Sequence, residues 1–174
     1  MTTARLLLAP GASGGVERLA PMASALGALG LSVGLVPLPR GKAERAVPGY
    51  RQALEAEAAD TAIGGHSFGG RVASLLAAEA APTPAALVLL SYPLHAPGRH
   101  DTWDARTSHW PAIRCPVLLL SGEADPFARI DLLHTAVERL DISVLRTWPR
   151  LGHGMGPVLD EAVEEIVRFL ASRT

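Results

Sequence analysis

Residues Thr61 to Gly70 read TAIGGHSFGG, a stretch that joins a short apolar run to an alanine-rich one through a cluster of glycines. Within it, Gly65-His66-Ser67-Phe68-Gly69 matches the pattern G-x-S-x-G. A serine in this pattern, placed between a strand and a helix, stands on a sharp turn that exposes its hydroxyl. Glycines two residues before and after it let neighbouring backbone approach without Cβ clashes. Ser67 is therefore a candidate nucleophile, and the alternative is a serine that caps the helix beginning at Phe68.

Around this stretch, short apolar runs alternate with longer amphipathic ones, the pattern of βα units that feed a parallel sheet. Continuous apolar runs such as residues 86–90 and 116–120 suit strands buried on both faces. Six strands are expected, at Arg5 to Ala9, Ser32 to Val36, Thr61 to Gly65, Ala86 to Ser91, Pro116 to Ser121 and Ile142 to Trp148. Helices are expected at Val16 to Leu29, Ala43 to Ala59, Phe68 to Ala80, Ile130 to Arg139 and Leu159 to Ser172. The predicted fold class is α/β, with about six mainly parallel strands, helices on both faces and no separate lid domain.

Length and composition narrow the classes of protein and partner. The 174 residues suit one domain, residues 1–174, and the formal charge of −1 offers no basic excess for nucleic acid or an anionic membrane. No stretch approaches the ~20 apolar residues of a membrane span, and the run Leu6 to Ala9 is too short for a signal-peptide core. The single cysteine, Cys115, cannot form an intramolecular disulfide. We expect a cytoplasmic protein with a small-molecule substrate, and its oligomeric state is not encoded in any pattern.

The amino-acid usage indicates the kind of genome that encodes the chain. Of 16 basic residues only Lys42 is a lysine, and alanine, glycine and proline are abundant. This usage is typical of a GC-rich bacterial genome.

A serine hydroxyl is a weak nucleophile, so it needs a histidine base and an acid that orients that base. In the expected order, the acid follows the serine and the histidine comes last. After the fifth strand the chain reads GEADPF, which makes Asp125 the expected acid and Glu123 the alternative in the same turn. After the last strand it reads PRLGHGMG, and the glycine-flanked His153 is the expected base among six histidines. An ordinary helix cap at Asp125 and an ordinary surface histidine at 153 are the competing interpretations.

Acyl transfer also needs donors for the oxyanion that forms in the transition state. The Phe68 N–H comes with the turn at Ser67. The second donor is expected in the loop after the first strand, APGASGG, from Ala12 N–H or from its neighbour Gly11. The same loop could suggest a phosphate cradle, but it matches neither G-x-x-x-x-G-K-[ST] nor G-x-G-x-x-G. No cofactor is expected.

One segment breaks the alternation of strands and helices. Residues Ser91 to Cys115 carry prolines, three histidines and two tryptophans with little periodicity, which predicts a long loop at a strand end, where open α/β sheets place ligands. Four of its side chains form either a flap over Ser67 or a small private core: His100, Trp103, His109 and Trp110. The histidines lack a zinc spacing, so no metal is expected.

With these residues in view, the chain resembles the α/β-hydrolase superfamily over nearly its whole length. It resembles most the small lidless branch related to dienelactone hydrolases, and a hydrolase-like domain shared by bacterial proteins, testis-expressed homologues and a subunit of a histone-acetylation complex. The resemblance rests on LAPGASGG, GGHSFGGR, SYPLHAPG, CPVLLLSGEADPF and LGHGM, in that order. It implies the fold and the triad Ser67, Asp125 and His153. Many relatives have His-Gly in the oxyanion loop where this chain has Pro10-Gly11, which leaves the geometry of that loop less defined.

The same resemblance extends to the walls of a substrate pocket. It makes Tyr92 and His95 pocket candidates, and the alternative is that they only pack and bond their own loop. Met155, in the LGHGM stretch, is a further candidate. The expected function is hydrolysis of a small ester or thioester through an acyl-enzyme on Ser67. The alternative is a hydrolase-fold module with little or no catalysis that binds or scaffolds partners.

Overall fold

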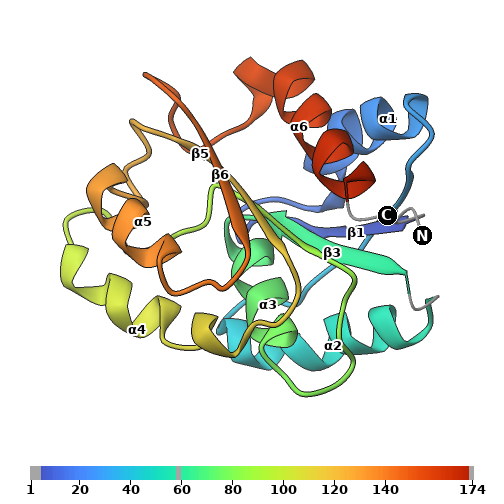
Figure 1. The fold of residues 1–174 in the computed structure, drawn as a ribbon, viewed down its shortest axis with the longest axis horizontal. Coiled ribbons are helices and arrows are strands. Elements are labelled where there is room, and N and C mark those ends of the chain that lie inside the picture. The colour runs from blue at the N-terminus through green and yellow to red at the C-terminus, as the bar shows by residue number, and fades with distance from the viewer. Residues whose placement is uncertain (1–4, 58–59, 173–174) are drawn as a thin grey trace.

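The computed structural model describes residues 5–57 and 60–172, and its centre is one six-stranded sheet (Figure 1). The strands are β1 (Arg5–Ala9), β2 (Ser32–Leu35), β3 (Thr61–His66), β4 (Leu87–Leu90), β5 (Val117–Gly122) and β6 (Ser143–Trp148). They lie in the order β2-β1-β3-β4-β5-β6, and every neighbouring pair is parallel. The predicted strands are confirmed, each end lying within one residue of its expected place.

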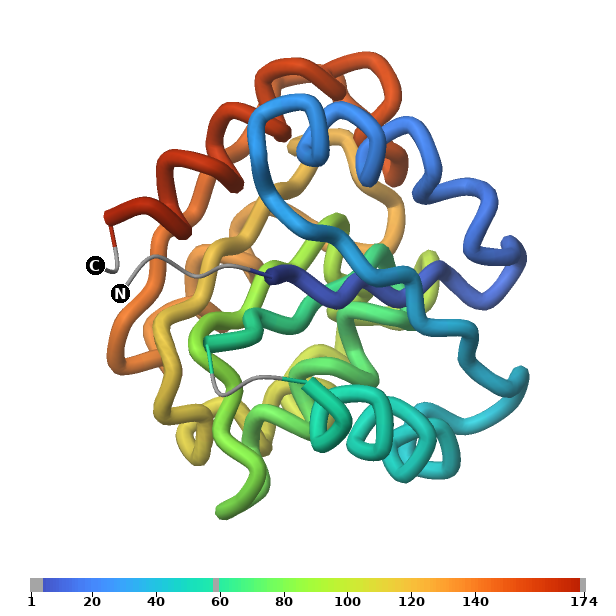
Figure 2. The backbone as a smooth tube through the Cα atoms, turned by 90° about the vertical axis from the view of Figure 1, so that its right-hand side faces the viewer, coloured from blue at the N-terminus to red at the C-terminus, as the bar shows by residue number. Residues whose placement is uncertain are grey.

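Helices cover both faces of this sheet. They are α1 (Ala20–Ala28), α2 (Ala43–Glu55), α3 (Phe68–Ala77), α4 (Trp103–Thr107), α5 (Ile130–Val137) and α6 (Leu159–Ala171). The helices α1 and α6 lie together on one face, and α2, α3 and α5 cover the other (Figures 1 and 2). The α/β class with helices on both faces is therefore confirmed. The last two residues of the expected helix from Ala43 to Ala59 lie outside the described residues.

The strand order places the site. From β1 the chain goes outward to β2, and it then returns to the other side of β1 for β3 and continues outward from there. The carboxyl ends of β1 and β3 are thus the switch point of the sheet, where loops leave in opposite directions and ligands bind in open α/β sheets. The loop with Gly11 and Ala12 leaves β1 there, and Ser67 follows β3 directly.

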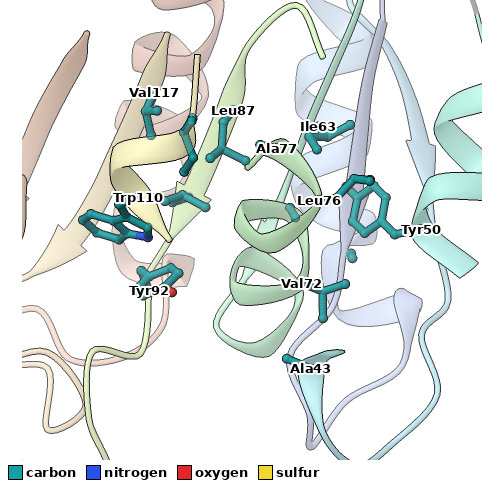
Figure 3. Packing of buried hydrophobic residues seen from close by; sticks show 14 of the residues in the cluster. Ala43, Tyr50, Ile63, Val72, Leu76, Ala77, Leu87, Tyr92, Trp110 and Val117 are labelled. Atoms are coloured by element: carbon teal, nitrogen blue, oxygen red, sulfur yellow. The ribbon is translucent and has the colours of Figure 1, made fainter. Parts of the chain in front are cut away.

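Two hydrophobic cores lie on the two faces of the sheet, and one of them holds α3 in place. On the α3 side, Val72 and Leu76 pack among strand residues, with Tyr50 on one side of the helix and the Tyr92–Trp110 pair on the other (Figure 3). Tyr50 is fully buried, and its hydroxyl lies 2.8 Å from the Leu7 carbonyl oxygen and 2.7 Å from that of Gly64. This hydroxyl ties α2 to β1 and β3 beside the switch point.

The segment from Ser91 to Cys115 differs from the prediction of a long loop. It contains α4 and two short 3-10 helices, His100–Thr102 and Trp110–Ala112. Trp110 is fully buried and meets the ring of Tyr92 edge-on at 5.0 Å, while the Arg139 guanidinium lies over the Trp103 ring at 4.5 Å. The helical pieces are too short to leave a periodic pattern, and the packing of the tryptophans orders them. Trp110 belongs to the core and the partly buried Trp103 packs against it, and neither side chain lines a cavity at Ser67.

Candidate active site

Ser67 occupies a strained turn between β3 and α3. Its backbone has φ 51° and ψ −114°, a conformation that residues other than glycine rarely adopt. A Cβ at Gly65 would lie 2.5 Å from the Ala9 carbonyl oxygen, and one at Gly69 would lie 2.1 Å from the same atom. Only glycine permits the end of β1 to pass this close to the turn. The Ser67 side chain makes no capping bond to α3, so the helix-cap interpretation is wrong.

The structure brings Ser67, His153 and Asp125 into one hydrogen-bonded chain. The Ser67 Oγ lies 2.8 Å from His153 Nε2, and His153 Nδ1 lies 2.8 Å from Asp125 Oδ2. With its proton on Nδ1, the imidazole donates to the carboxylate and leaves Nε2 to accept the hydroxyl proton of Ser67. The Asp125 side chain is fully buried, whereas the His153 side chain is 24% exposed. The base can thus be reached by solvent, and the acid cannot.

The two loops that carry Asp125 and His153 are fastened to each other. The Ala124 N–H donates to the Leu151 carbonyl at 2.9 Å, and a Cβ at Gly122 would lie 2.1 Å from that same oxygen. Asp125 also accepts the Phe127 N–H through Oδ1 at 2.8 Å, so it stabilises its own turn while it faces His153. The alternative acid, Glu123, is exposed and instead accepts the hydroxyl of Thr147.

His66, the residue before Ser67, bonds the backbone of the base His153, a role that no sequence pattern predicted. Its Nε2–H donates to the main-chain carbonyl of His153 at 2.6 Å, and the two rings lie 5.0 Å apart. Burial lowers the pKa of His66 and outweighs the opposite effect of that carbonyl, so the ring is neutral at neutral pH. The Phe127 ring also contacts the His153 ring, with 4.5 Å between the ring centroids. The imidazole is therefore in contact with both His66 and Phe127.

Backbone N–H groups suited to bind an oxyanion lie beside Ser67. Phe68 opens α3, so its N–H has no acceptor inside the helix. Gly11 passes directly against the serine, because a Cβ added there would lie 3.6 Å from Ser67 Cβ and 3.1 Å from His66 Nδ1. Within residues 5–57 and 60–172, no hydrogen bond occupies the N–H of Phe68, Gly11 or Ala12. Gly11 and Ala12 both line the cavity next to Ser67, so either can supply the second donor.

Two cavities meet at Ser67, and Phe127 also lines both. One has a volume of about 610 Å³ and lies between the β1 loop, α1 and the residues that follow His153. Its walls include the apolar side chains of Leu19, Pro21, Met22, Leu90, Met155 and Leu159. The other has a volume of about 820 Å³ and lies between the start of α2, α3 and the segment after β4. Both volumes fall in the range of small-molecule sites.

Of the three predicted pocket residues, only Met155 lines either cavity. Tyr92 is buried, and its hydroxyl donates to the Arg106 carbonyl at 2.7 Å. His95 is buried too, and its Nε2 accepts the Arg129 N–H at 3.0 Å. The structure does not support Tyr92 and His95 as pocket walls, because both side chains are buried: Tyr92 bonds within its own segment, and His95 bonds the backbone at the start of α5. The cavity is lined instead by their neighbours Pro93 and Ala96.

In the described part of the chain, no group of three or more histidine, cysteine, aspartate or glutamate side chains is placed to hold a metal ion. Across the same residues, no helix combines the length and the apolar character needed to cross a membrane.

Comparison with known proteins identifies the family. Residues 39–154 match the family model described as an alpha/beta hydrolase domain, and the chain belongs to this family. A monoacylglycerol lipase from Paleococcus ferrophilus is similar in structure, with a TM-score of 0.83, 17% sequence identity, and coverage of 98% of this chain and 95% of that one. A dienelactone hydrolase from Anabaena variabilis aligns with a TM-score of 0.78 at 22% identity, covering 96% of this chain and 85% of its own. The resemblance to the α/β-hydrolase superfamily is confirmed.

A third similar structure is Est1E from Butyrivibrio proteoclasticus, with a TM-score of 0.80 and 15% identity over 97% of this chain and 87% of that one. Identities this low establish the shared fold alone. Substrate and mechanism have to be argued from this chain's own residues.

Proposed function

We propose that this protein is a serine hydrolase that cleaves a small ester or thioester through an acyl-enzyme on Ser67. The observation that carries the proposal is the chain of contacts from Ser67 Oγ to His153 Nε2 and from His153 Nδ1 to Asp125 Oδ2, each 2.8 Å long. In such a chain the histidine activates the serine, and the acid fixes the tautomer of the histidine. The free N–H groups beside the serine supply the remaining requirement, a site for the oxyanion.

The first half of the reaction forms the acyl-enzyme. Ser67 Oγ attacks the carbonyl carbon of the ester while its proton passes to His153 Nε2. The carbonyl oxygen becomes an oxyanion, which the N–H of Phe68 and the N–H of Ala12 or Gly11 bind. Asp125 stabilises the imidazolium that forms. The C–O or C–S bond then breaks, and the leaving alcohol or thiol takes the proton from His153.

The second half releases the acid. Water gives a proton to the neutral His153 and attacks the acyl carbon, and the same N–H groups bind the second oxyanion. When the bond to Ser67 breaks, the proton on His153 returns to Ser67 Oγ. The products are a carboxylic acid and the free enzyme. Each step uses the 24% exposed imidazole, which water can reach.

Labelling with a fluorophosphonate probe, together with hydrolysis of short-chain aryl esters, tests the proposal. The wild-type protein is expected to be labelled and active, and Ser67→Ala is expected to lose both properties, with a rate loss on the order of 10⁴-fold or more. Ser24→Ala, which changes an exposed serine of α1, is the matched control and keeps both. A wild-type protein that is neither labelled nor active would overturn the proposal and favour the binding or scaffold module.

A further inference from the structure

The cavity of about 820 Å³ beside Ser67 has a strongly basic lining. Four basic residues contribute to it, Lys42, Arg45, Arg71 and Arg106, against one acidic residue, Glu44. The whole chain carries 16 basic and 17 acidic residues, so this excess of positive charge is local. A cleft lined by one sign of charge attracts ligands of the opposite sign.

Two of these arginines face the cavity with little neutralisation. Arg71 forms an ion pair with Glu44 at 3.2 Å, but the Glu44 side chain is 59% exposed, and exposed ion pairs contribute little. The Arg71 Nε is buried and has no hydrogen-bond partner among the described residues. Arg106 donates to the Pro93 carbonyl at 3.0 Å, and no carboxylate in the described part of the chain lies within 4.0 Å of its guanidinium.

The positive charges of the two guanidiniums act on each other. Burial lowers the pKa of Arg106, and the positive charge of Arg71 lowers it further. Arginine nevertheless stays charged at neutral pH, so the pair retains a repulsion that a bound anion would relieve. Glu44 offsets one of the four positive charges, so the lining keeps an excess of three, and Arg106 is among the basic residues that no carboxylate of the described residues pairs with. A negatively charged ligand group is therefore favoured here.

Arg71 lies in the first turn of α3, where its N–H donates to the Ser67 carbonyl at 3.0 Å, and Ser67, Arg71 and Arg106 line the same cavity. An anionic group held by Arg71 and Arg106 therefore shares that cavity with a carbonyl positioned at Ser67. The second cavity at Ser67 is apolar on most of its walls. The two cavities therefore differ in the chemistry that they accept.

We propose that the substrate of this enzyme is an ester or thioester that carries a carboxylate close to the scissile bond, with the carboxylate bound by Arg71 and Arg106 and the uncharged part of the molecule in the apolar cavity. A planar guanidinium recognises a carboxylate through paired hydrogen bonds. The inference rests on the proposed function, since it names the substrate class of the same site.

The test compares two aryl esters of equal chain length, 4-nitrophenyl hexanoate and mono-4-nitrophenyl adipate, which differ by a terminal carboxylate. The wild-type enzyme is expected to prefer the adipate ester by about tenfold or more in kcat/KM, the effect of one charge-assisted hydrogen bond. Arg106→Gln is expected to reduce that preference by about tenfold, and Arg106→Lys, which keeps the charge, to retain part of it.

Arg99→Gln is the matched control. Arg99 lies in the same segment but does not line the cavity, and its side chain is 67% exposed beside Asp101. Its substitution is expected to change the preference by less than about twofold. Equal rates for the two esters in the wild type, or an unchanged preference in Arg106→Gln, would overturn the inference while hydrolysis of the hexanoate ester still supported the proposed function.

When neither ester is cleaved, a binding measurement tests the inferred carboxylate site separately from the proposed hydrolase function. Monomethyl adipate is titrated calorimetrically into Ser67→Ala and into Ser67→Ala combined with Arg106→Gln. The inference expects the double variant to bind about tenfold more weakly. Equal binding by both variants, or no binding by either, contradicts it independently of catalysis. Inorganic phosphate is titrated in parallel, and tighter binding of phosphate would contradict the choice of a carboxylate.

Discussion

A methyl group at residue 69 is expected to damage the site without touching any of the polar groups that form it. Gly69 is the second residue of α3, and the Cβ of an alanine there would lie 2.1 Å from the Ala9 carbonyl oxygen and 2.7 Å from that of Pro10. Real Cβ atoms essentially never approach closer than 3.0 Å, so the Ala9–Pro10 backbone has to move by about 1 Å. Gly11 and Ala12 follow directly, and their N–H groups move with it.

The size of the effect follows from that displacement. A misplacement of about 1 Å in a catalytic group costs on the order of 100-fold in rate, and the overpacking costs about 1–3 kcal/mol of unfolding free energy. Gly69→Ala is thus expected to remain folded at 25 °C, with an ester kcat/KM about 100-fold below that of the wild type. Denaturant unfolding measures the stability, and aryl-ester kinetics measure the rate.

Gly49→Ala provides the matched control, because Gly49 also lies inside a helix, α2, and nothing stands within 4 Å of an added Cβ. It is expected to raise the unfolding free energy by about 0.5–1 kcal/mol, since alanine favours the helix, and to leave the rate unchanged. A folded Gly69→Ala enzyme with wild-type kcat/KM would refute the argument that this close approach positions the oxyanion loop.

Two further predictions concern histidines. His66→Phe removes the N–H that donates to the His153 carbonyl and is expected to lower kcat by about tenfold. His66→Gln retains a donor and is expected to lose less. Equal kcat values for His66→Phe and the wild type would contradict a role of this hydrogen bond in positioning His153. His109 has its pKa lowered to about 4, first by burial and then by the charge of Arg71, so the unfolded chain binds a proton at pH 4–6.5 that the folded chain does not. The contribution of this group to the unfolding free energy is complete above pH 6.5 and falls as the pH is lowered, by at most about 2 kcal/mol at pH 5. Urea unfolding at pH 7.5 and pH 5 is expected to show a smaller loss of stability for His109→Gln than for the wild type, because the variant lacks the titrating imidazole. An identical loss in both proteins would contradict the assignment.

The strands and most of the helices could be predicted because their signals are local. Apolar runs bounded by glycine and proline fixed each strand to within a residue, and G-x-S-x-G identified the turn at Ser67 from five adjacent residues. The order of serine, acid and histidine, each after a strand, indicated Asp125 or Glu123 as the acid and the glycine-flanked His153 as the base, and the structure brings Asp125 against His153. The structure places all three at one edge of the sheet because carboxyl ends of parallel strands share that edge.

Side-chain direction in the segment after β4 could not be predicted. Tyr92 and His95 fall in a stretch without a repeating pattern, so nothing local indicates which side chains face the cavity. Burial of Trp110 against Tyr92 turns both rings toward the core and leaves Pro93, Ala96 and Arg106 at the cavity wall. The same packing orders the short helices of a segment that was predicted as a loop.

What the sequence by itself determined is the alternation of strands and helices, the glycine-lined turn that exposes Ser67, and the identity of its two partners, because each depends on residues that are neighbours in the chain or on a fixed order along it. Only the tertiary structure decided that Ser67 Oγ meets an imidazole 86 positions away, that His66 donates to the main-chain carbonyl of His153, and that Arg71 and Arg106 share one cavity. Those contacts depend on how the helices and loops pack on the sheet, since the distance between two side chains is set by that packing rather than by their separation in sequence.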